Sequence, residues 1–160
     1  MPDLTETDGA LLRRAIDVAR RARAHGNHPF GAVLAGETGQ VLLEVENTVL
    51  TVRDITGHAE TNLIRLASAQ WPRETLAHCT LYTSTEPCPM CAGAIYWAGV
   101  GRVVYGLSQE GLYALGGEGS EGLLLHCRDV FGHGRHVVEV LGPALEAEAR
   151  EVHEGFWTRA

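Results

Sequence analysis

The sequence predicts one α/β domain over residues 1–160, with three layers (αβα) around a central mixed sheet of five strands. Segments that alternate like strands are interleaved with segments of helical periodicity, the order expected of a sheet covered by helices on both faces. The first two strand-like segments are joined by a short turn and form a hairpin, so the sheet is mixed and not purely parallel. The length of 160 residues is that of a single domain.

A helix and a hairpin are expected first. Apolar residues recur on one helical face within Gly9–His25, and either Thr7 or Asp8 can cap the start of this helix. Strand-like patterns follow at Phe30–Ala35 and Val41–Glu46, with a glycine-containing turn between them.

Five arginines cover much of the remaining surface of the first helix, namely Arg13, Arg14, Arg20, Arg21 and Arg23. Such a helix could bind nucleic acid, or it could be a solvated outer face whose apolar arginine stems pack toward the sheet. We favour the solvated face because 13 Lys and Arg stand against 20 Asp and Glu, a formal net charge of −7. An acidic protein repels a phosphate backbone.

The middle of the chain contains the segments on which the chemistry depends. After an unpatterned loop at Asn47–Gly57 we expect a helix at His58–Gln70, which ends at Trp71–Pro72 because the residue before a proline disfavours helix. A strand, an apolar helix rich in small residues and another strand are expected next, at Cys79–Ser84, Pro89–Ala98 and Arg102–Tyr105.

The patterns weaken toward the C-terminus. Six glycines within 106–122 indicate a mobile or closely packed loop. A short helix is expected at Leu123–Phe131 and a last strand at Val137–Leu141. Pro143 is expected in the first turn of a closing helix that runs to about Trp157.

Composition excludes several classes of protein. Apolar residue types make up 45% and charged types 21%, a balance that excludes a fibre and a largely disordered chain. No apolar run approaches the roughly 18 residues of a membrane span, and the N-terminus lacks the basic-then-apolar pattern of a secretion signal. We therefore expect a cytoplasmic protein without membrane contact. In that reducing compartment, the four cysteines favour metal binding or catalysis over disulfides.

Two short motifs, each at the start of a predicted helix, indicate a metal site. His58 and Glu60 lie at the head of one helix, and Cys88 and Cys91 at the head of another. A spacing of three on a helix points both sulfurs the same way, and the helix N-terminus favours their thiolate form. One imidazole and two thiolates would hold Zn²⁺ and leave a fourth tetrahedral position for water. Glu60 can reach that water as a general acid and base.

Other interpretations of these motifs are open. A Cys-x-x-Cys motif alone is also typical of thiol redox centres. A closed structural zinc site would require a fourth protein ligand, and neither Cys79 nor Cys127 has the paired spacing expected of one. The chain could also be a zinc-stabilised binding module without catalysis. A carboxylate directed at an open zinc position has a use only in an enzyme, so Glu60 favours catalysis.

The joint pattern of His-x-Glu followed by Pro-Cys-x-x-Cys is the signature of zinc-dependent deaminases. The chain resembles the cytidine and deoxycytidylate deaminase superfamily up to about Gly106, about two thirds of its length. Within that superfamily the chain is most similar to bacterial guanine deaminases, on the segments Pro29–Val33, Asp54–Glu60 and Glu86–Ala98 and on Asn47. The tRNA adenosine deaminases and fungal-type cytosine deaminases share the zinc motif.

This resemblance implies a cytidine deaminase-like fold, a homodimer, and one zinc ion per chain held by the imidazole and the two thiolates described above. It implies that Glu60 moves protons, and that Asn47 and the backbone of Ala59 contact the base. Asn47 could instead cap the turn after its strand. Phe30 could stack on a flat ring, or it could belong to the core.

The resemblance makes guanine the first candidate substrate, converted to xanthine and ammonia. Cytosine, another nucleoside, and adenosine in tRNA are the alternatives. The predicted closing helix carries four glutamates and one arginine within 145–154, which argues against tRNA. The expected partner is therefore a small nucleobase or nucleoside.

The resemblance also suggests roles for two acidic residues and for two aromatic residues near the C-terminus. Guanine deaminases recognise the purine edge with an acidic residue beyond the zinc helices, and Glu118 and Glu121 are the candidates here, although this segment departs from the family's pattern. Phe156 and Trp157 could form an aromatic lid over the pocket, or they could anchor the last helix to the sheet.

Overall fold

A computed structural model of the chain describes residues 3–157, and its central feature is a five-stranded sheet with the strand order β2-β1-β3-β4-β5. The strands are β1 (Gly31–Ala35), β2 (Val41–Glu46), β3 (Thr80–Thr85), β4 (Arg102–Leu107) and β5 (Glu139–Leu141). Strand β1 pairs antiparallel with β2 and β3, whereas β3 with β4 and β4 with β5 are parallel. The predicted mixed sheet is confirmed, and each strand end lies within two residues of its predicted place.

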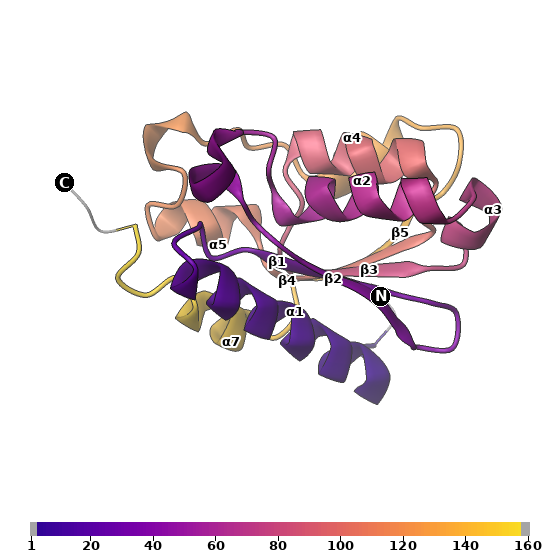
Figure 1. Cartoon of the computed structure of the whole chain (residues 1–160), viewed down its shortest axis with the longest axis horizontal. Coiled ribbons are helices and arrows are strands. Elements are labelled where there is room, and N and C mark those ends of the chain that lie inside the picture. Colours follow the sequence, from indigo (N-terminus) through magenta and orange to yellow (C-terminus); the bar gives the residue numbers. More distant parts are fainter. Residues whose placement is uncertain (1–2, 158–160) are drawn as a thin grey trace.

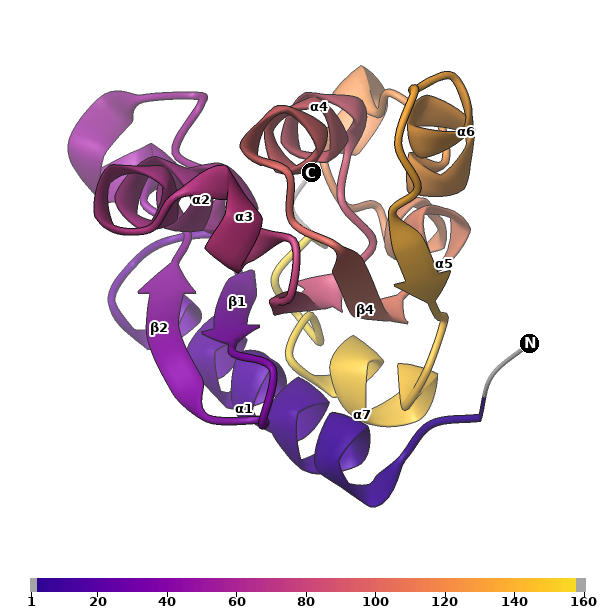
Figure 2. The ribbon, with the colours of Figure 1, turned by 90° about the vertical axis from the view of Figure 1, so that its right-hand side faces the viewer.

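Helices cover both faces of this sheet, as predicted (Figure 1, Figure 2). On one face lie α1 (Glu6–Ala24) and α7 (Glu146–Glu151), and on the other α2 (Ala59–Gln70) and α4 (Pro89–Ala98) pack against each other. The shorter helices are α3 (Arg73–Leu76), α5 (Gln109–Ala114) and α6 (Cys127–Gly132), of which α6 packs against α4. No helix within residues 3–157 is both long and apolar enough to cross a membrane.

The first helix begins three residues before its predicted start, and Thr5 caps it in place of Thr7 or Asp8. The Thr5 hydroxyl accepts a hydrogen bond from the Asp8 N–H, and the Asp8 carboxylate accepts one from the Thr5 N–H, which is a capping box. Helix α1 lies very close to the sheet at Gly31, where a Cβ atom would lie 2.5 Å from the backbone nitrogen of Ala19. Only glycine fits this contact.

The arginines of α1 pair with acidic side chains of neighbouring elements. Arg14 and Arg21 both contact Glu44 of β2, and Arg13 contacts Glu148 of α7 at 2.9 Å. These three arginine side chains remain about half exposed. Their charge is matched by carboxylates, which agrees with the solvated outer face that the sequence favoured over a nucleic-acid surface.

The helix expected to begin at Leu123 begins only at Cys127. The reason is that the backbone N–H and C=O of Leu125 bond to the side chain of Gln109, 16 residues earlier, at 3.1 and 2.9 Å. A backbone whose polar groups are already paired in this way cannot also join a helical hydrogen-bond ladder.

The closing helix is also shorter than predicted. Helix α7 spans only Glu146–Glu151, and Pro143 lies before it instead of in its first turn. The residue that precedes the helix, Leu145, has a left-handed backbone with φ of 52°, and Gly155 has φ of 72°. Neither torsion belongs to a right-handed helix. The helix therefore cannot include Leu145 at its start or continue through Gly155, and the chain after α7 forms turns to Trp157.

Two segments expected as loops contain short helical turns. Within Asn47–Gly57 a π-helical turn spans Val49–Arg53. The glycine-rich segment 106–122 contains α5 and a 3₁₀ turn at Gly119–Glu121. Turns this short lack the apolar repeat that identifies a longer helix in a sequence.

A buried ion pair ties α1 to the sheet. The carboxylate of Asp8 accepts two hydrogen bonds from Arg102, at 2.7 and 2.9 Å, and a third from the hydroxyl of Tyr82, at 2.8 Å. The Arg102 guanidinium, helped by Tyr82 and Thr5, holds the pKa of Asp8 well below its usual value.

We expect this ion pair to make the stability depend on pH. Because the pKa of Asp8 is lower in the folded than in the unfolded chain, its contribution is present above about pH 4 and is lost as the pH falls further toward the folded pKa. Asp8→Asn should lower the free energy of unfolding at neutral pH by about 1.5–3 kcal/mol, because Arg102 loses two short hydrogen bonds to a carboxylate and keeps the longer contact with Glu139 at 3.6 Å. Urea unfolding at neutral pH and at about pH 3 checks this.

Asp17→Asn is the matched control, since Asp17 lies on the same helix but is exposed and pairs only across the surface with Arg20. It should change the free energy of unfolding by less than about 0.5 kcal/mol. Equal effects of the two substitutions would contradict the role given to Asp8.

Candidate metal centre and its cavity

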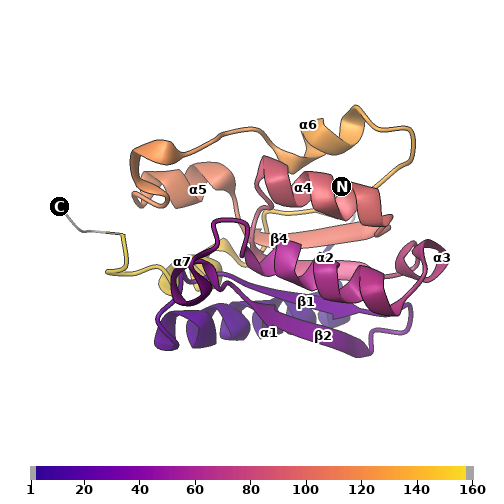
Figure 3. The same ribbon diagram turned by 45° about the horizontal axis from the view of Figure 1, so that its top comes forward.

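Three possible metal ligands meet where α2 and α4 begin, and these two helices run side by side (Figure 3). His58 is the residue immediately before α2, Cys88 the residue immediately before α4, and Cys91 lies in the first turn of α4. The sulfur of each cysteine lies 3.5 Å from Nδ1 of His58. The structure therefore brings together the three residues that the sequence proposed as ligands, within 4.8 Å of one another.

The geometry of these three atoms fits Zn²⁺. Tetrahedral zinc with Zn–N of about 2.0–2.1 Å and Zn–S of about 2.3 Å places nitrogen and sulfur ligands roughly 3.6 Å apart. The observed separations of 3.5 Å match that value. Among residues 3–157 no fourth Cys, His, Asp or Glu joins the group, and Cys79 instead donates to the carbonyl of Thr75. A closed zinc site with four protein ligands is therefore not formed.

The ligands influence one another's protonation strongly. A hydrogen bond from Cys91, with further help from His58, lowers the pKa of the Cys88 thiol to about 4. The same interaction with Cys88, together with burial, raises the pKa of Cys91. Burial opposes protonation of His58, but its hydrogen bond to Cys88 and the charge of Glu60 raise its pKa to about 9. Near neutral pH Cys88 is therefore a thiolate, and a metal ion that binds here would displace the protons of His58 and Cys91.

Glu60 lies in the first turn of α2, buried beside the ligands, and burial raises its pKa. The hydroxyl of Thr83 on β3 donates to its Oε1 at 2.5 Å and lies 2.9 Å from the carbonyl oxygen of Thr85. Thr83 has one hydroxyl proton and two acceptors, so it can donate to an ionised Glu60 or, when Glu60 is protonated, to Thr85. It thereby provides a partner for both states of the carboxyl group.

A cavity of about 360 Å³ opens beside this centre. Its lining residues are Phe30, Ile55, His58, Glu60, Thr85, Glu86, Cys88, Pro89, Met90, Gln109, Leu112, Tyr113, Glu118, Glu121 and Leu123. Four of them are glutamates, and no Lys or Arg of residues 3–157 belongs to the lining. Apart from its acidic groups the cavity is mainly apolar, as is usual for pockets that enclose small organic molecules.

The substrate residues suggested by the sequence divide into two groups. Phe30, Glu118 and Glu121 line the cavity together with Glu60. Glu118 is half-buried with a left-handed backbone, and burial raises its pKa. Asn47 and Ala59, although buried, do not line the cavity.

The sequence predicts that Asn47 either caps a turn or contacts the base, and its two amide atoms have different environments. Its Oδ1 accepts a hydrogen bond from the N–H of Val49 at 3.0 Å, as expected of a residue that caps a turn. Its Nδ2 is buried and finds no hydrogen-bond partner among residues 3–157. The amide therefore has a donor to spare.

The aromatic residues at the end of the described chain pack against the sheet side of the cavity. The ring of Trp157 lies 5.3 Å from that of His28 and 6.1 Å from that of Phe30, between ring centres, and its indole N–H donates to Nδ1 of His153. Phe156 contacts the same cluster. Trp157 itself does not line the cavity, whereas Phe30 both contacts Trp157 and lines the cavity.

Sequence reasoning missed several residues of the site. Thr83 gave no signal beyond its place in a strand, because only the fold shows that it faces Glu60. Glu86 precedes the Pro-Cys motif directly and could have been singled out as a charged residue expected to be buried. Tyr113 and Gln109 fall in a segment that was interpreted as a glycine-rich loop.

The chain is similar to a known protein family and to deaminases of several organisms. A family model for the cytidine and deoxycytidylate deaminase zinc-binding region matches residues 5–107. A probable cytosine deaminase of Schizosaccharomyces pombe is 45% identical over 157 residues, which cover 97% of this chain and 95% of that protein. A tRNA-specific adenosine deaminase of Haemophilus influenzae is 32% identical over 155 residues, covering 97% and 86%. A solved guanine deaminase from Nitrosomonas europaea superposes with a TM-score of 0.76 at 26% identity, covering 95% of this chain and 85% of that one.

Proposed function

Because the chain belongs to the cytidine and deoxycytidylate deaminase family, we propose that it removes an amine by hydrolysis from a free nucleobase or nucleoside, with guanine the first candidate. The products from guanine would be xanthine and ammonia. Deaminase chemistry as such follows from the family and from the relatives. The observation that carries the proposal is the buried carboxyl group of Glu60 beside a three-ligand metal centre at the wall of a cavity.

We assign one zinc ion per chain to Nδ1 of His58 and to the sulfurs of Cys88 and Cys91. When bound there, zinc supplies the polarisation that makes water nucleophilic near neutral pH. Glu60 would take one proton from an attacking water as the water oxygen bonds to the ring carbon that bears the amine, and would place that proton on the adjacent ring nitrogen. Glu60 then moves the second proton to the amine, which leaves with the electron pair of the C–N bond as ammonia while a carbonyl forms.

The charge of the cavity supports a substrate without phosphate. The lining contains four glutamates and no basic side chain from residues 3–157, so the described cavity offers no Lys or Arg to pair with the phosphate of a nucleotide or of a tRNA backbone. Guanine keeps N–H donors on its ring besides the reacting amine, and the carboxylates of Glu118 and Glu121 can accept hydrogen bonds from them.

The remaining substrate contacts are proposals of the same kind. The spare donor on Nδ2 of Asn47 supports a contact with the base. The family implies that the backbone of Ala59 contacts the base. Ala59 directly follows the ligand His58, which supports this contact. Phe30 is positioned in the cavity lining, where a flat ring could stack on it. A lid formed by Phe156 and Trp157 would be connected to the site through Phe30.

Cytosine is the second candidate substrate. One specific observation favours it, namely the 45% identity to the probable cytosine deaminase of Schizosaccharomyces pombe across 97% of this chain.

Ammonia release from a panel of substrates tests these proposals. Zinc-loaded protein is incubated with guanine, adenine, cytosine, their nucleosides, deoxycytidylate and an adenosine-containing tRNA stem-loop. We expect guanine to react fastest and both phosphate-bearing substrates to stay at background. Faster release from cytosine would select the second candidate. Release from deoxycytidylate or tRNA would contradict the charge argument, and release from no substrate would contradict the function.

We further propose a homodimer that forms through the outer face of α4 in the cytoplasm. This helix has no charged residue among its ten, yet Trp97 is 77% exposed. Apolar helices with an open apolar face are typical of interfaces. The four cysteines are all free thiols, which suits a reducing compartment. The molar mass in solution checks this: the unaltered protein should have the mass of a dimer, and Trp97→Lys that of a monomer. A monomer mass for the unaltered protein would contradict the proposal.

A further inference from the structure

One wall of the cavity comes from a single loop, residues 110–125. Five cavity residues lie on it, namely Leu112, Tyr113, Glu118, Glu121 and Leu123. The loop contains only the short helix α5 and a 3₁₀ turn of three residues, and none of its residues belongs to the sheet. Leu112 packs into the core, and the polar contacts that tie the loop to the metal centre lie at its two ends.

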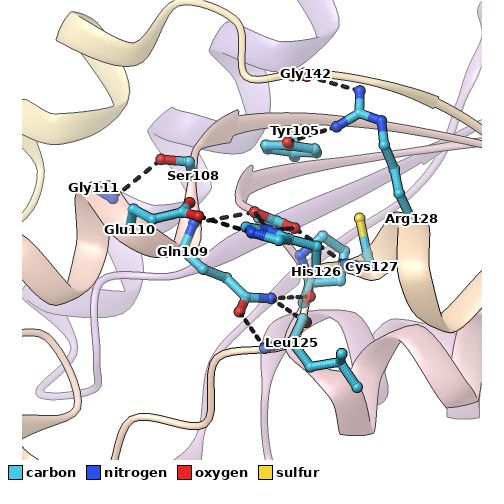
Figure 4. Close-up of polar contacts among 12 residues, drawn as sticks. Tyr105, Ser108, Gln109, Glu110, Gly111, Leu125, His126, Cys127, Arg128 and Gly142 are labelled. Carbon is cyan, nitrogen blue, oxygen red and sulfur yellow. Dashed lines mark hydrogen bonds and ion pairs between the residues drawn. The ribbon is translucent and has the colours of Figure 1, made fainter.

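The two ends of the loop are joined by the buried amide of Gln109. Its Nε2 donates to the carbonyl of Leu125 at 2.9 Å, and its Oε1 accepts from the N–H of Leu125 at 3.1 Å. This pair of bonds resembles the pairing of two neighbouring strands. The same Nε2 donates to the carbonyl of Pro87, the residue before the ligand Cys88, at 3.1 Å. Figure 4 shows Gln109 reaching Leu125.

The carboxylate of Glu86 fastens the same two ends to the strand that leads to the metal centre. Its side chain is only 1% exposed. Its Oε1 accepts from the N–H of Gln109 and its Oε2 from the N–H of Cys127, each at 3.1 Å, and its backbone N–H donates to Leu107 at 2.7 Å. Nδ1 of His126 lies 3.1 Å from Oε2 of Glu86 as well.

The polar atoms of both side chains are thus occupied by the protein. Glu86 and Gln109 border the cavity, but the two oxygens of Glu86 and both atoms of the Gln109 amide already have partners. Glu86 and Gln109 are therefore placed to hold the loop 110–125, which we call the wall. The cavity residues of the wall remain available to contact a substrate.

We propose that Glu86 and Gln109 are positioning residues that set the distance between the wall 110–125 and the metal ligands, and thereby the ring size of the aminated heterocycle that the site accepts. This inference rests on the proposed function. Both side chains bond to the chain immediately around Pro87, so the wall cannot shift relative to Cys88 unless these hydrogen bonds break.

Two nearly isosteric substitutions test the proposal. In Gln109→Glu, an acceptor replaces the donor that faces the carbonyls of Pro87 and Leu125. In Glu86→Gln, an amide N–H replaces one of the two acceptors that face backbone N–H groups. The measurements are kcat and KM for guanine and cytosine, which differ in ring size, the zinc content, and hydrogen exchange of 110–125 compared with α2.

We expect both variants to keep their zinc and to retain kcat, while KM for the preferred ring rises about tenfold per lost hydrogen bond. The ratio of kcat/KM between the two rings should fall by a similar factor, and amides of 110–125 should exchange faster while those of α2 do not. If Gln109→Glu does not fold, Gln109→Met, which keeps the volume, takes its place.

Glu37→Gln is the control, because Glu37 is exposed in the β1–β2 hairpin, where it lies 3.9 Å from His78 and outside the wall 110–125. It should leave all four measurements unchanged. Loss of zinc, or an equal loss of kcat for both rings with unaltered exchange, would overturn the proposal. If the unaltered protein deaminates neither ring, the proposed function fails, and unchanged hydrogen exchange in the variants would separately overturn the positioning of the wall.

Discussion

Replacement of Glu60 by glutamine is expected to abolish deamination and to leave the metal centre intact. Glutamine has the size of glutamate and can accept the hydrogen bond from Thr83, but it cannot take up and release a proton. A positioned general acid or base contributes about 10²–10⁴-fold in rate, and Glu60 serves both proton transfers, so the rate should fall by at least this factor. Ammonia release measures the activity, and metal analysis should still find about one zinc ion per chain, since Glu60 is not a ligand.

A matched control separates the proton transfer from a general loss of negative charge. Glu37 lies in the β1–β2 hairpin with its side chain 76% exposed, and Glu37→Gln should retain full activity. Thr83→Val keeps the carboxyl group but removes its hydrogen-bond partner, so an intermediate rate is expected. Substantial activity in Glu60→Gln would show that another group moves the protons.

Removal of zinc is expected to stop the reaction completely and to destabilise the fold. The ligands belong to two helices that begin next to each other, so a metal ion at this point links α2 to α4. At a free zinc concentration of about 1,000 times Kd, binding stabilises the native state by about 4 kcal/mol. Dialysis against a chelator should therefore lower both ammonia release and the midpoint of thermal unfolding, and added zinc should restore both.

His58→Ala should reproduce the effect of the chelator, whereas His78→Ala should not, because the side chain of His78 is 67% exposed and lies beside a hollow that contains none of the ligands. This comparison also separates zinc hydrolysis from thiol redox chemistry at Cys88 and Cys91. A redox centre would keep its function in the presence of the chelator and lose it on alkylation of the thiols.

The elements that carry the metal centre could be predicted because their sequence signals are local. The spacing of Cys88 and Cys91, with a proline between them, predicts the start of a helix, and α4 has the predicted bounds Pro89–Ala98. His58 likewise stands directly before the periodic segment that forms α2. In each case the ligand type and the helix start lie within a few residues of each other, so neither depends on tertiary contacts.

The cavity wall could not be predicted because it depends on contacts between distant parts of the chain. The apolar run Leu123–Leu125 is typical of a helix. The side chain of Gln109 hydrogen-bonds the N–H and C=O of Leu125 instead, and the run belongs to neither a helix nor a strand. The position of Thr83 opposite Glu60 depends on which face of β3 meets α2. Asn47 is a third case, since one half of its amide caps a turn and the other half has no partner among residues 3–157.

The match to the family model ends at Leu107, the last residue of β4, and the cavity wall begins three residues later. The metal ligands and Glu60 therefore lie within the matched residues, and the wall 110–125 lies beyond them. A relative that prefers another base could donate its own version of residues 110–125, and the graft would meet the anchoring side chains of Glu86 and Gln109 on the recipient. Such modularity offers a route by which descendants of one ancestor acquire new substrates without rebuilding their reactive centre.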